Sequence, residues 1–180
     1  MIKWHIERYD RLRTSTASRA SVVLSAGALL SAGNVLLITQ ILARSADWLR
    51  SWWLLLFTLI AVTGVGLVMA SLLRAAGVLV TLRSSRAEFA SAGELPVSLI
   101  YNGTDTLAHL PTFEAFRSAV RGQDPDDAAA AAEVELWVCI NQHRSRYARL
   151  RQAVRLLRHA ALAYVAAMLL ALVVNMTYGL

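Results

Sequence analysis

Residues 20–43 read ASVVLSAGALLSAGNVLLITQILA and contain no Asp, Glu, Lys, Arg or His. Residues 51–73 and 160–180 share this property. A helix rises about 1.5 Å per residue, so about 20 apolar residues are enough to cross a hydrocarbon core of about 30 Å. The three stretches therefore predict an all-α integral membrane protein with three transmembrane helices.

The composition of the chain agrees with a membrane protein. Its 180 residues are 57% hydrophobic with a mean hydropathy of +0.48, which is high for a soluble domain of this length. Cys139 is the single cysteine, which excludes a disulfide framework and a thiolate metal cluster within the chain. We expect no cofactor and no metal site.

The distribution of charge predicts the orientation of the three helices. Basic residues cluster before the first apolar stretch and on both sides of the segment that precedes the third. Because basic loops stay in the cytoplasm, we expect the N-terminus inside, a short outer loop, and the C-terminus outside a bacterial inner (plasma) membrane. The predicted parts are a cytoplasmic helix at 1–19, a hairpin at 20–82 (spans about 20–43 and 51–73 or longer, outer loop 44–50), a cytoplasmic helical segment at 83–158, and a third transmembrane helix at 159–180.

Two local features refine this topology. The sequence Ala43-Arg44-Ser45-Ala46 could act as a signal-peptidase site, but the apolar stretch before it is too long for a secretory signal, so we expect an uncleaved anchor. Three tryptophans should lie at the outer interface, where indole rings are favoured, with Tyr178 at the same level. They are Trp48, Trp52 and Trp53.

The third transmembrane helix should continue a long cytoplasmic helix. Asp124 can cap a helix, Pro125 suits its first position, and no further Pro or Gly occurs before Gly179. About 50 helical residues would rise about 75 Å. A short helix is expected over residues 112–120 with Thr112 as its N-cap, and residues 95–101 could be extended.

Polar and small residues within the apolar stretches predict contacts between helices. Asn34, Gln40 and Asn175 should form interhelical hydrogen bonds, since an unsatisfied amide in hydrocarbon is costly; lining a pore is the alternative. Small residues that permit close approach occur on the first two stretches. They are Ser21, Ser25, Ala28 and the pair Gly27/Ser31 on the first, and the pair Gly66/Ala70 on the second.

The arginines of the long helix are the candidate anion-binding residues. Six Arg residues lie between positions 144 and 158, whereas acidic residues lie at the helix start. This asymmetry complements the helix dipole and follows the positive-inside rule. The functional alternative is that some of them bind lipid headgroups or a nucleotide phosphate, since the guanidinium fork matches phosphate oxygens. The best candidates are Arg144, Arg146, Arg149 and Arg151.

The sequence provides little for catalysis or nucleic-acid binding. Cys139 and His143 are four residues apart on one helix, but no orienting third group is evident. Asp105 and His109 share that spacing without further metal ligands. The net charge of +6 lies beside apolar stretches, which fits an anionic leaflet better than a nucleic acid. We therefore expect a protein that is not an enzyme.

The layout resembles a family of bacterial anti-phage proteins. These are the transmembrane effectors of Pycsar-type systems, which cyclic pyrimidine nucleotides activate. The similarity rests on the junction Ser18-Arg19-Ala20-Ser21 leading into residues 22–30, on the hairpin followed by a cytoplasmic segment, and on the sequence RYARL at 146–150 before the last stretch. Two-span effectors of the SLATT type are a rival match.

This resemblance implies a function that the residue pattern does not. Pycsar-type effectors disrupt the membrane after sensing a nucleotide, which implies cUMP or cCMP as ligand and growth arrest or death of the infected cell. Near the first junction the family has an acidic residue and usually a Lys, where this chain has Ala17 and Arg19. That difference weakens the transfer of any ligand contact.

The sequence thus supports two hypotheses. The first is a non-enzymatic, homo-oligomeric inner-membrane effector whose partners are the bilayer and a cyclic nucleotide sensed by the cytoplasmic segment. The second is a passive adaptor that binds a cytoplasmic partner through Trp137, Ile140 and Tyr147.

Overall fold

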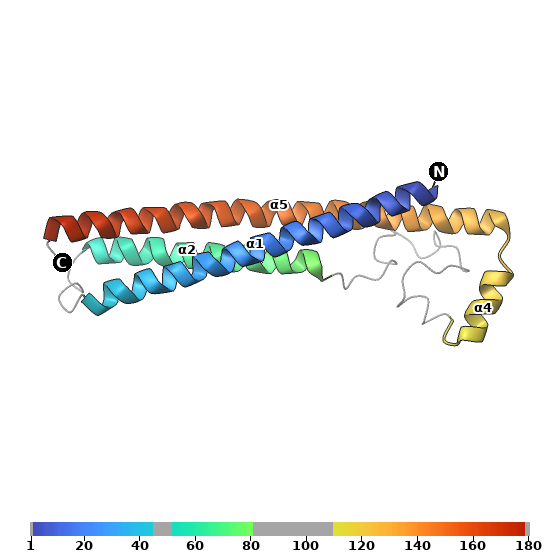
Figure 1. Ribbon diagram of the computed structural model, residues 1–180, viewed down its shortest axis with the longest axis horizontal. Coiled ribbons are helices and arrows are strands. Elements are labelled where there is room, and N and C mark those ends of the chain that lie inside the picture. Colours follow the sequence, from blue (N-terminus) through green and yellow to red (C-terminus); the bar gives the residue numbers. More distant parts are fainter. Residues whose placement is uncertain (1, 45–51, 81–109, 179–180) are drawn as a thin grey trace. The chain divides into compact units, whose positions relative to one another are not determined.

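The structure is a computed structural model that describes residues 2–44, 52–80 and 110–178. Within these ranges the chain forms four helices, labelled in Figure 1. They are α1 (Ile2–Arg44), α2 (Trp52–Leu79), α4 (Phe113–Arg121) and α5 (Pro125–Tyr178).

Helix α5 has the continuity expected from the sequence, and α1 is continuous as well. Helix α1 joins the charged leader to the first apolar stretch, because no Pro interrupts its 43 residues. Helix α5 begins at Pro125 and continues for 54 residues, so the third apolar stretch is the end of the long helix. The N-cap prediction for α4 is also confirmed, since the Thr112 side chain accepts a hydrogen bond from the Ala115 amide.

Helix α2 ends slightly earlier than the possible extension to Leu82. Its last residue is Leu79, and the Val80 amide still donates to the Ala76 carbonyl. Several sequence predictions lie outside the described residues. These are Trp48, the extended segment at 95–101, and the pair Asp105 and His109.

The chain divides into two compact units, and each is described by itself. The first unit comprises residues 1–15 and 81–146, and its described part contains the start of α1, helix α4 and the start of α5. The second comprises residues 16–80 and 147–180, and contains the rest of α1, helix α2 and the rest of α5. We call the second unit the apolar bundle.

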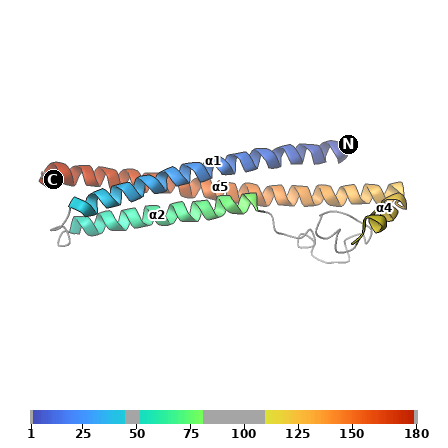
Figure 2. The same cartoon turned by 60° about the horizontal axis from the view of Figure 1, so that its bottom comes forward.

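The three helices of the apolar bundle pack through a seam with a heptad-like spacing. They lie side by side in both ribbon views (Figures 1 and 2). On α5 four of the buried residues are seven apart: Ala153, Ala160, Ala167 and Val174. Alternating steps of three and four keep one face towards the partners, as in left-handed helix packing. On α2 these steps connect Leu54, Phe57, Ala61, Gly64, Val68, Ser71, Ala75 and Val78.

The seam is built mainly from small side chains. One cluster joins Ala20 and Val23 on α1 with Ala75 and Val78 on α2 and with Leu150 and Ala153 on α5. A second cluster joins Phe57 and Ala61 on α2 with Ala167 on α5. Helices with small facing residues can bring their backbones close together, which increases the dispersion contact between them.

The glycines of the two predicted small-residue pairs have different environments within the chain. Gly27 is buried, and a β-carbon built on it would lie 2.6 Å from Leu72 Cδ2. Gly66 is exposed, and a β-carbon there would meet nothing within 4 Å. The packing glycine of α2 is Gly64, whose β-carbon would lie 3.5 Å from Ala163 Cβ. The predicted face on α1, at Ser21, Ser25 and Ala28, is exposed.

The outward surface of the apolar bundle is also hydrophobic. Large apolar side chains are exposed on all three helices, for example Leu29, Leu55, Leu59, Leu162 and Met176. All three helices are long and apolar enough to cross a membrane. A soluble monomer rarely exposes contiguous apolar patches of more than a few hundred Å², so this surface is typical of one that contacts lipid.

Gly27 offers a test of the seam. We expect Gly27→Val to lower the stability of the bundle by about 1–3 kcal/mol, because the new side chain must displace Leu72. The matched control is Gly66→Val, which places the same side chain on the open surface of α2. Thermal unfolding of the full chain in detergent measures both. Equal melting temperatures for the two variants would contradict this packing.

Candidate functional site

The structure separates the four candidate arginines by exposure. Arg144 and Arg151 are exposed on α5, whereas Arg146 is 5% exposed and Arg149 is half-buried. Arg144 and Arg151 are seven positions apart, and Arg146 and Arg149 are three positions apart. Each pair therefore lies on one side of α5, and the two pairs lie on different sides. Arg144 and Arg146 belong to the first unit, and Arg149 and Arg151 to the apolar bundle.

Arg149 has a structural role at the end of α2. Its Nη1 donates a hydrogen bond of 2.8 Å to the Gly77 carbonyl. The last four carbonyls of a helix have no partner within the helix, and the negative end of the helix dipole favours a cation there. Helix α2 ends at Leu79, so Gly77 belongs to this last turn. Arg149 therefore caps α2.

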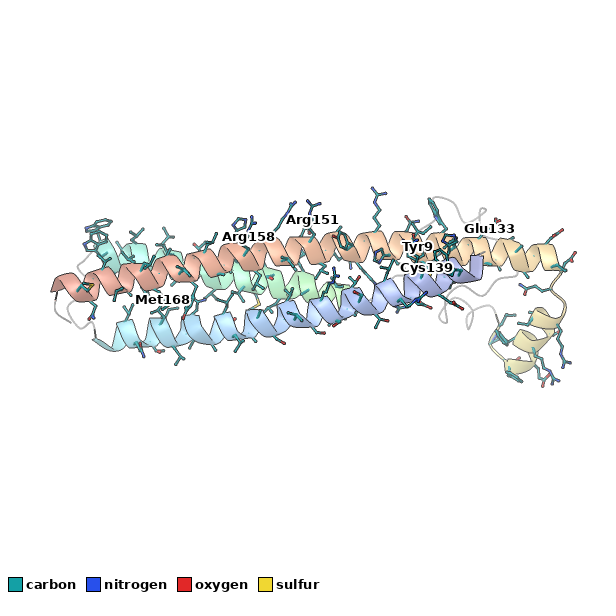
Figure 3. The ribbon with its side chains drawn as sticks, turned by 45° about the horizontal axis from the view of Figure 1, so that its top comes forward. Tyr9, Glu133, Cys139, Arg151, Arg158 and Met168 are labelled. Carbon is teal, nitrogen blue, oxygen red and sulfur yellow. The ribbon has the colours of Figure 1, made fainter. Side chains whose placement is uncertain are left out.

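A different set of arginines is exposed on the apolar bundle. Arg151, Arg155 and Arg158 are all exposed, and their spacings of four and three place them on one face of α5. Figure 3 shows Arg151 and Arg158 projecting from the same side of this helix. Arg19 on α1 and Arg74 on α2 are exposed as well. We call these five residues the arginine collar.

The buried hydrogen bond between the helices comes from a residue that the sequence analysis did not single out. Ser71 Oγ donates to the Ala153 carbonyl at 2.8 Å, and both residues are fully buried. Serine is too common in helices for its sequence position to identify such a bond. The heptad spacing of α2 was the available signal, since it includes Ser71.

The three predicted intramembrane polar residues have different environments. Asn34 is fully buried, and its Nδ2 donates to the Leu30 carbonyl of its own helix. Asn34 Oδ1 has no hydrogen-bond partner and would lie 3.8 Å from a β-carbon built on Gly64. Gln40 and Asn175 are exposed on the bundle surface. Interhelical bonding by these three amides stays a prediction.

Two of the predicted interface aromatics are described, and both lie at the start of α2. The rings of Trp52 and Trp53 stack with centroids 3.9 Å apart, and Trp52 is 60% exposed. Amphipathic indole rings at the end of an apolar helix are typical of a membrane interface.

The first unit contains a small polar cluster where α1 meets α5. The rings of Tyr9 and His143 have centroids 5.9 Å apart. One turn earlier on α5, the Cys139 thiol donates to Glu135 Oε1 at an Sγ–Oε1 distance of 3.7 Å. Figure 3 labels Tyr9 and Cys139 at this position.

The electrostatics of this cluster oppose an activated thiolate. Burial, reinforced by the negative charges of Glu135 and Asp10, raises the pKa of Cys139 to about 11. Burial also raises the pKa of Glu135, and the Asp10 carboxylate adds to that increase. Nucleophilic cysteines need a depressed pKa, so the Cys139 thiol is inert at neutral pH. Among the described residues, no group of three or more His, Cys, Asp or Glu could hold a metal ion.

Comparisons with known proteins leave the family open. No family model, no curated protein and no solved structure matches this chain.

Glu135 offers a test of this cluster. Iodoacetamide alkylation of Cys139 should have a pH midpoint near 11, because the thiolate is the reacting form. Removing the neighbouring carboxylate by Glu135→Gln should lower the pKa of the thiol, shift the midpoint to lower pH and accelerate alkylation at pH 8. Glu133→Gln is the control, since Glu133 is exposed on the same helix. A midpoint near 8.5 in the parent protein would refute the buried geometry.

Arg149 offers a test of the cap on α2. Arg149→Gln should lower stability by about 1–3 kcal/mol, because it removes a charged donor from a carbonyl at the helix end. Arg151→Gln removes the same charge two residues along α5 from an exposed position and should leave stability nearly unchanged. Thermal unfolding of both variants in detergent decides the point, and a larger loss from the Arg151 variant would contradict the role of Arg149.

Proposed function

We propose that this protein is a non-enzymatic inner-membrane effector. Its cytoplasmic segment, residues 83–158, would sense a signal, and its three apolar helices would then disrupt the bilayer. The ligand implied by the family resemblance is a cyclic pyrimidine nucleotide, cUMP or cCMP. The biological role would be anti-phage defence through arrest or death of the infected cell.

One observation carries the mechanistic part of this proposal. Helices α1 and α5 have 43 and 54 residues, whereas about 20 are enough to span a bilayer. The parts of these helices in the first unit, residues 2–15 and 125–146, carry most of their charged side chains. Since α5 is not interrupted, the end of the segment that would sense the signal shares a backbone with a segment that would cross the membrane.

The packing of the bundle is compatible with rearrangement. Alanine makes up more than half of the buried residues in its two clusters. Among the described residues, side-chain hydrogen bonds join α2 and α5 from Ser71 to Ala153 and from Arg149 to Gly77. Interhelical hydrogen bonds in membranes contribute modestly, about 0.6 kcal/mol on average. The proposed response is homo-oligomeric, because three spans are too few to enclose a conducting path in one chain.

Reconstitution into liposomes tests this proposal. Full-length protein would be inserted into vesicles that hold a potassium diffusion potential, reported by a voltage-sensitive dye. Addition of cUMP or cCMP should collapse the potential, whereas cAMP and protein-free vesicles serve as controls. A stable potential with every nucleotide, together with no binding of cUMP or cCMP by calorimetry, would overturn the proposal.

The adaptor hypothesis is the second candidate because two of its residues are exposed. Trp137 is 51% exposed and Tyr147 is 52% exposed, although Ile140 is half-buried. Large exposed aromatic side chains are common at protein interfaces. A stoichiometric partner recovered from membranes, without loss of potential on overexpression, would favour the adaptor; loss of that partner in Trp137→Ala would strengthen it.

A further inference from the structure

The described residues of the apolar bundle carry positive charge without negative side chains to balance it. The described residues of this unit, 16–44, 52–80 and 147–178, include no Asp or Glu. Arg149 donates to the end of α2, but the collar residues Arg19, Arg74, Arg151, Arg155 and Arg158 are exposed. Anions that balance the collar must therefore come from outside the described part of the bundle.

Contacts inside the bundle place the collar within a narrow band. Ala20, Ala75 and Ala153 belong to one buried cluster, which sets a common level on the three helices. Arg19 and Arg74 are sequence neighbours of the first two alanines, and Arg151 is two residues from the third. Arg155 and Arg158 follow within about two turns, so the five residues surround one end of the bundle.

The distance from this band to the other end of the bundle matches a bilayer. From Ser71, which bonds to Ala153, helix α2 runs to Trp52 over a rise of about 29 Å. That length corresponds to a hydrocarbon core of about 30 Å. With the stacked Trp52 and Trp53 at one interface, the collar lies at the level of the lipid phosphates of the other.

The surroundings of the collar favour a lipid over a soluble anion. On α5, Val154 is 48% exposed and Leu162 is 61% exposed, so apolar surface adjoins the arginines directly. A phospholipid presents a phosphate and acyl chains in the same arrangement. Arginine can bind phosphate oxygens through two parallel hydrogen bonds, and its long side chain allows Arg158 to reach the headgroups from a deeper position.

We infer that the arginine collar, centred on Arg151, Arg155 and Arg158, is a binding surface for the headgroups of anionic phospholipids. The lipids occupy the leaflet at the Arg149 end of the bundle. This inference requires insertion of the bundle into a membrane but no nucleotide signal, so it stands apart from the proposed effector activity.

Lipid retention measures this binding. The full-length protein would be purified from vesicles of equal phosphatidylglycerol and phosphatidylcholine, and retained lipids would be counted by native mass spectrometry. The parent should retain phosphatidylglycerol preferentially. The triple variant R151Q/R155Q/R158Q should lose this preference by at least about tenfold, since each basic residue near an anionic surface contributes about fivefold.

A matched triple variant tests whether the loss of lipid comes from these three positions or from the lower net charge of the protein. R11Q/R117Q/R121Q removes the same charge from exposed positions in the first unit and should keep the parent's preference. Single substitutions at 151, 155 and 158 provide a graded series should the triple variant not fold. Retention by R151Q/R155Q/R158Q equal to that of the parent would overturn the inference.

Competition experiments test whether the arginines bind the phosphate of a lipid or that of a soluble anion. Inorganic phosphate at millimolar concentration and a short oligonucleotide would each be added before lipid counting. We expect neither to displace phosphatidylglycerol, because neither supplies acyl chains for the apolar surface beside the arginines. Complete displacement by either would assign the collar to a soluble anion and refute lipid binding.

Discussion

A helix that crosses hydrocarbon must satisfy its backbone hydrogen bonds within itself, and this constraint governs the apolar bundle. It requires unbroken helices, and α1, α2 and α5 are each unbroken over the described residues of their apolar stretches. In lipid the hydrophobic effect does not drive helices together, so close packing between the helices has to stabilise their association. The seam of small residues follows from that requirement, with Ala153, Ala160 and Ala167 fully buried at intervals of seven on α5.

At the end of a helix the last carbonyls cannot be satisfied within the helix itself. The arginines of α5 near the end of α2 have two different roles there. The carbonyls in the last turn of α2 need donors, and Arg149 supplies one to Gly77. Two residues further along α5, Arg151 points away from the bundle and joins the exposed Arg155 and Arg158. Helix α5 thus carries one arginine, Arg149, that caps α2, and three others that are exposed on its outer face.

Local signals in the sequence predicted the helix boundaries well, because capping depends on neighbouring residues. Thr112 caps α4 and Pro125 begins α5, as expected. Signals that depend on a partner were less reliable. Gly66 and Gly64 are both glycines in an apolar helix, yet only Gly64 lies against α5. Likewise Asn34 is more polar than Ser71, but its amide donates within α1, whereas Ser71 Oγ donates to α5.

The sequence by itself determined the number of apolar helices, the continuity of α5, and the clustering of arginines before the last apolar stretch. These follow from composition and from short-range backbone preferences, which each segment carries alone. Only the tertiary structure decided which small residues form the seam, which arginine caps α2, and why the Cys139 thiol is inert. The reason is that rotation of a helix about its axis is set by all of its partners together, and that rotation decides whether a side chain faces a helix or the surroundings.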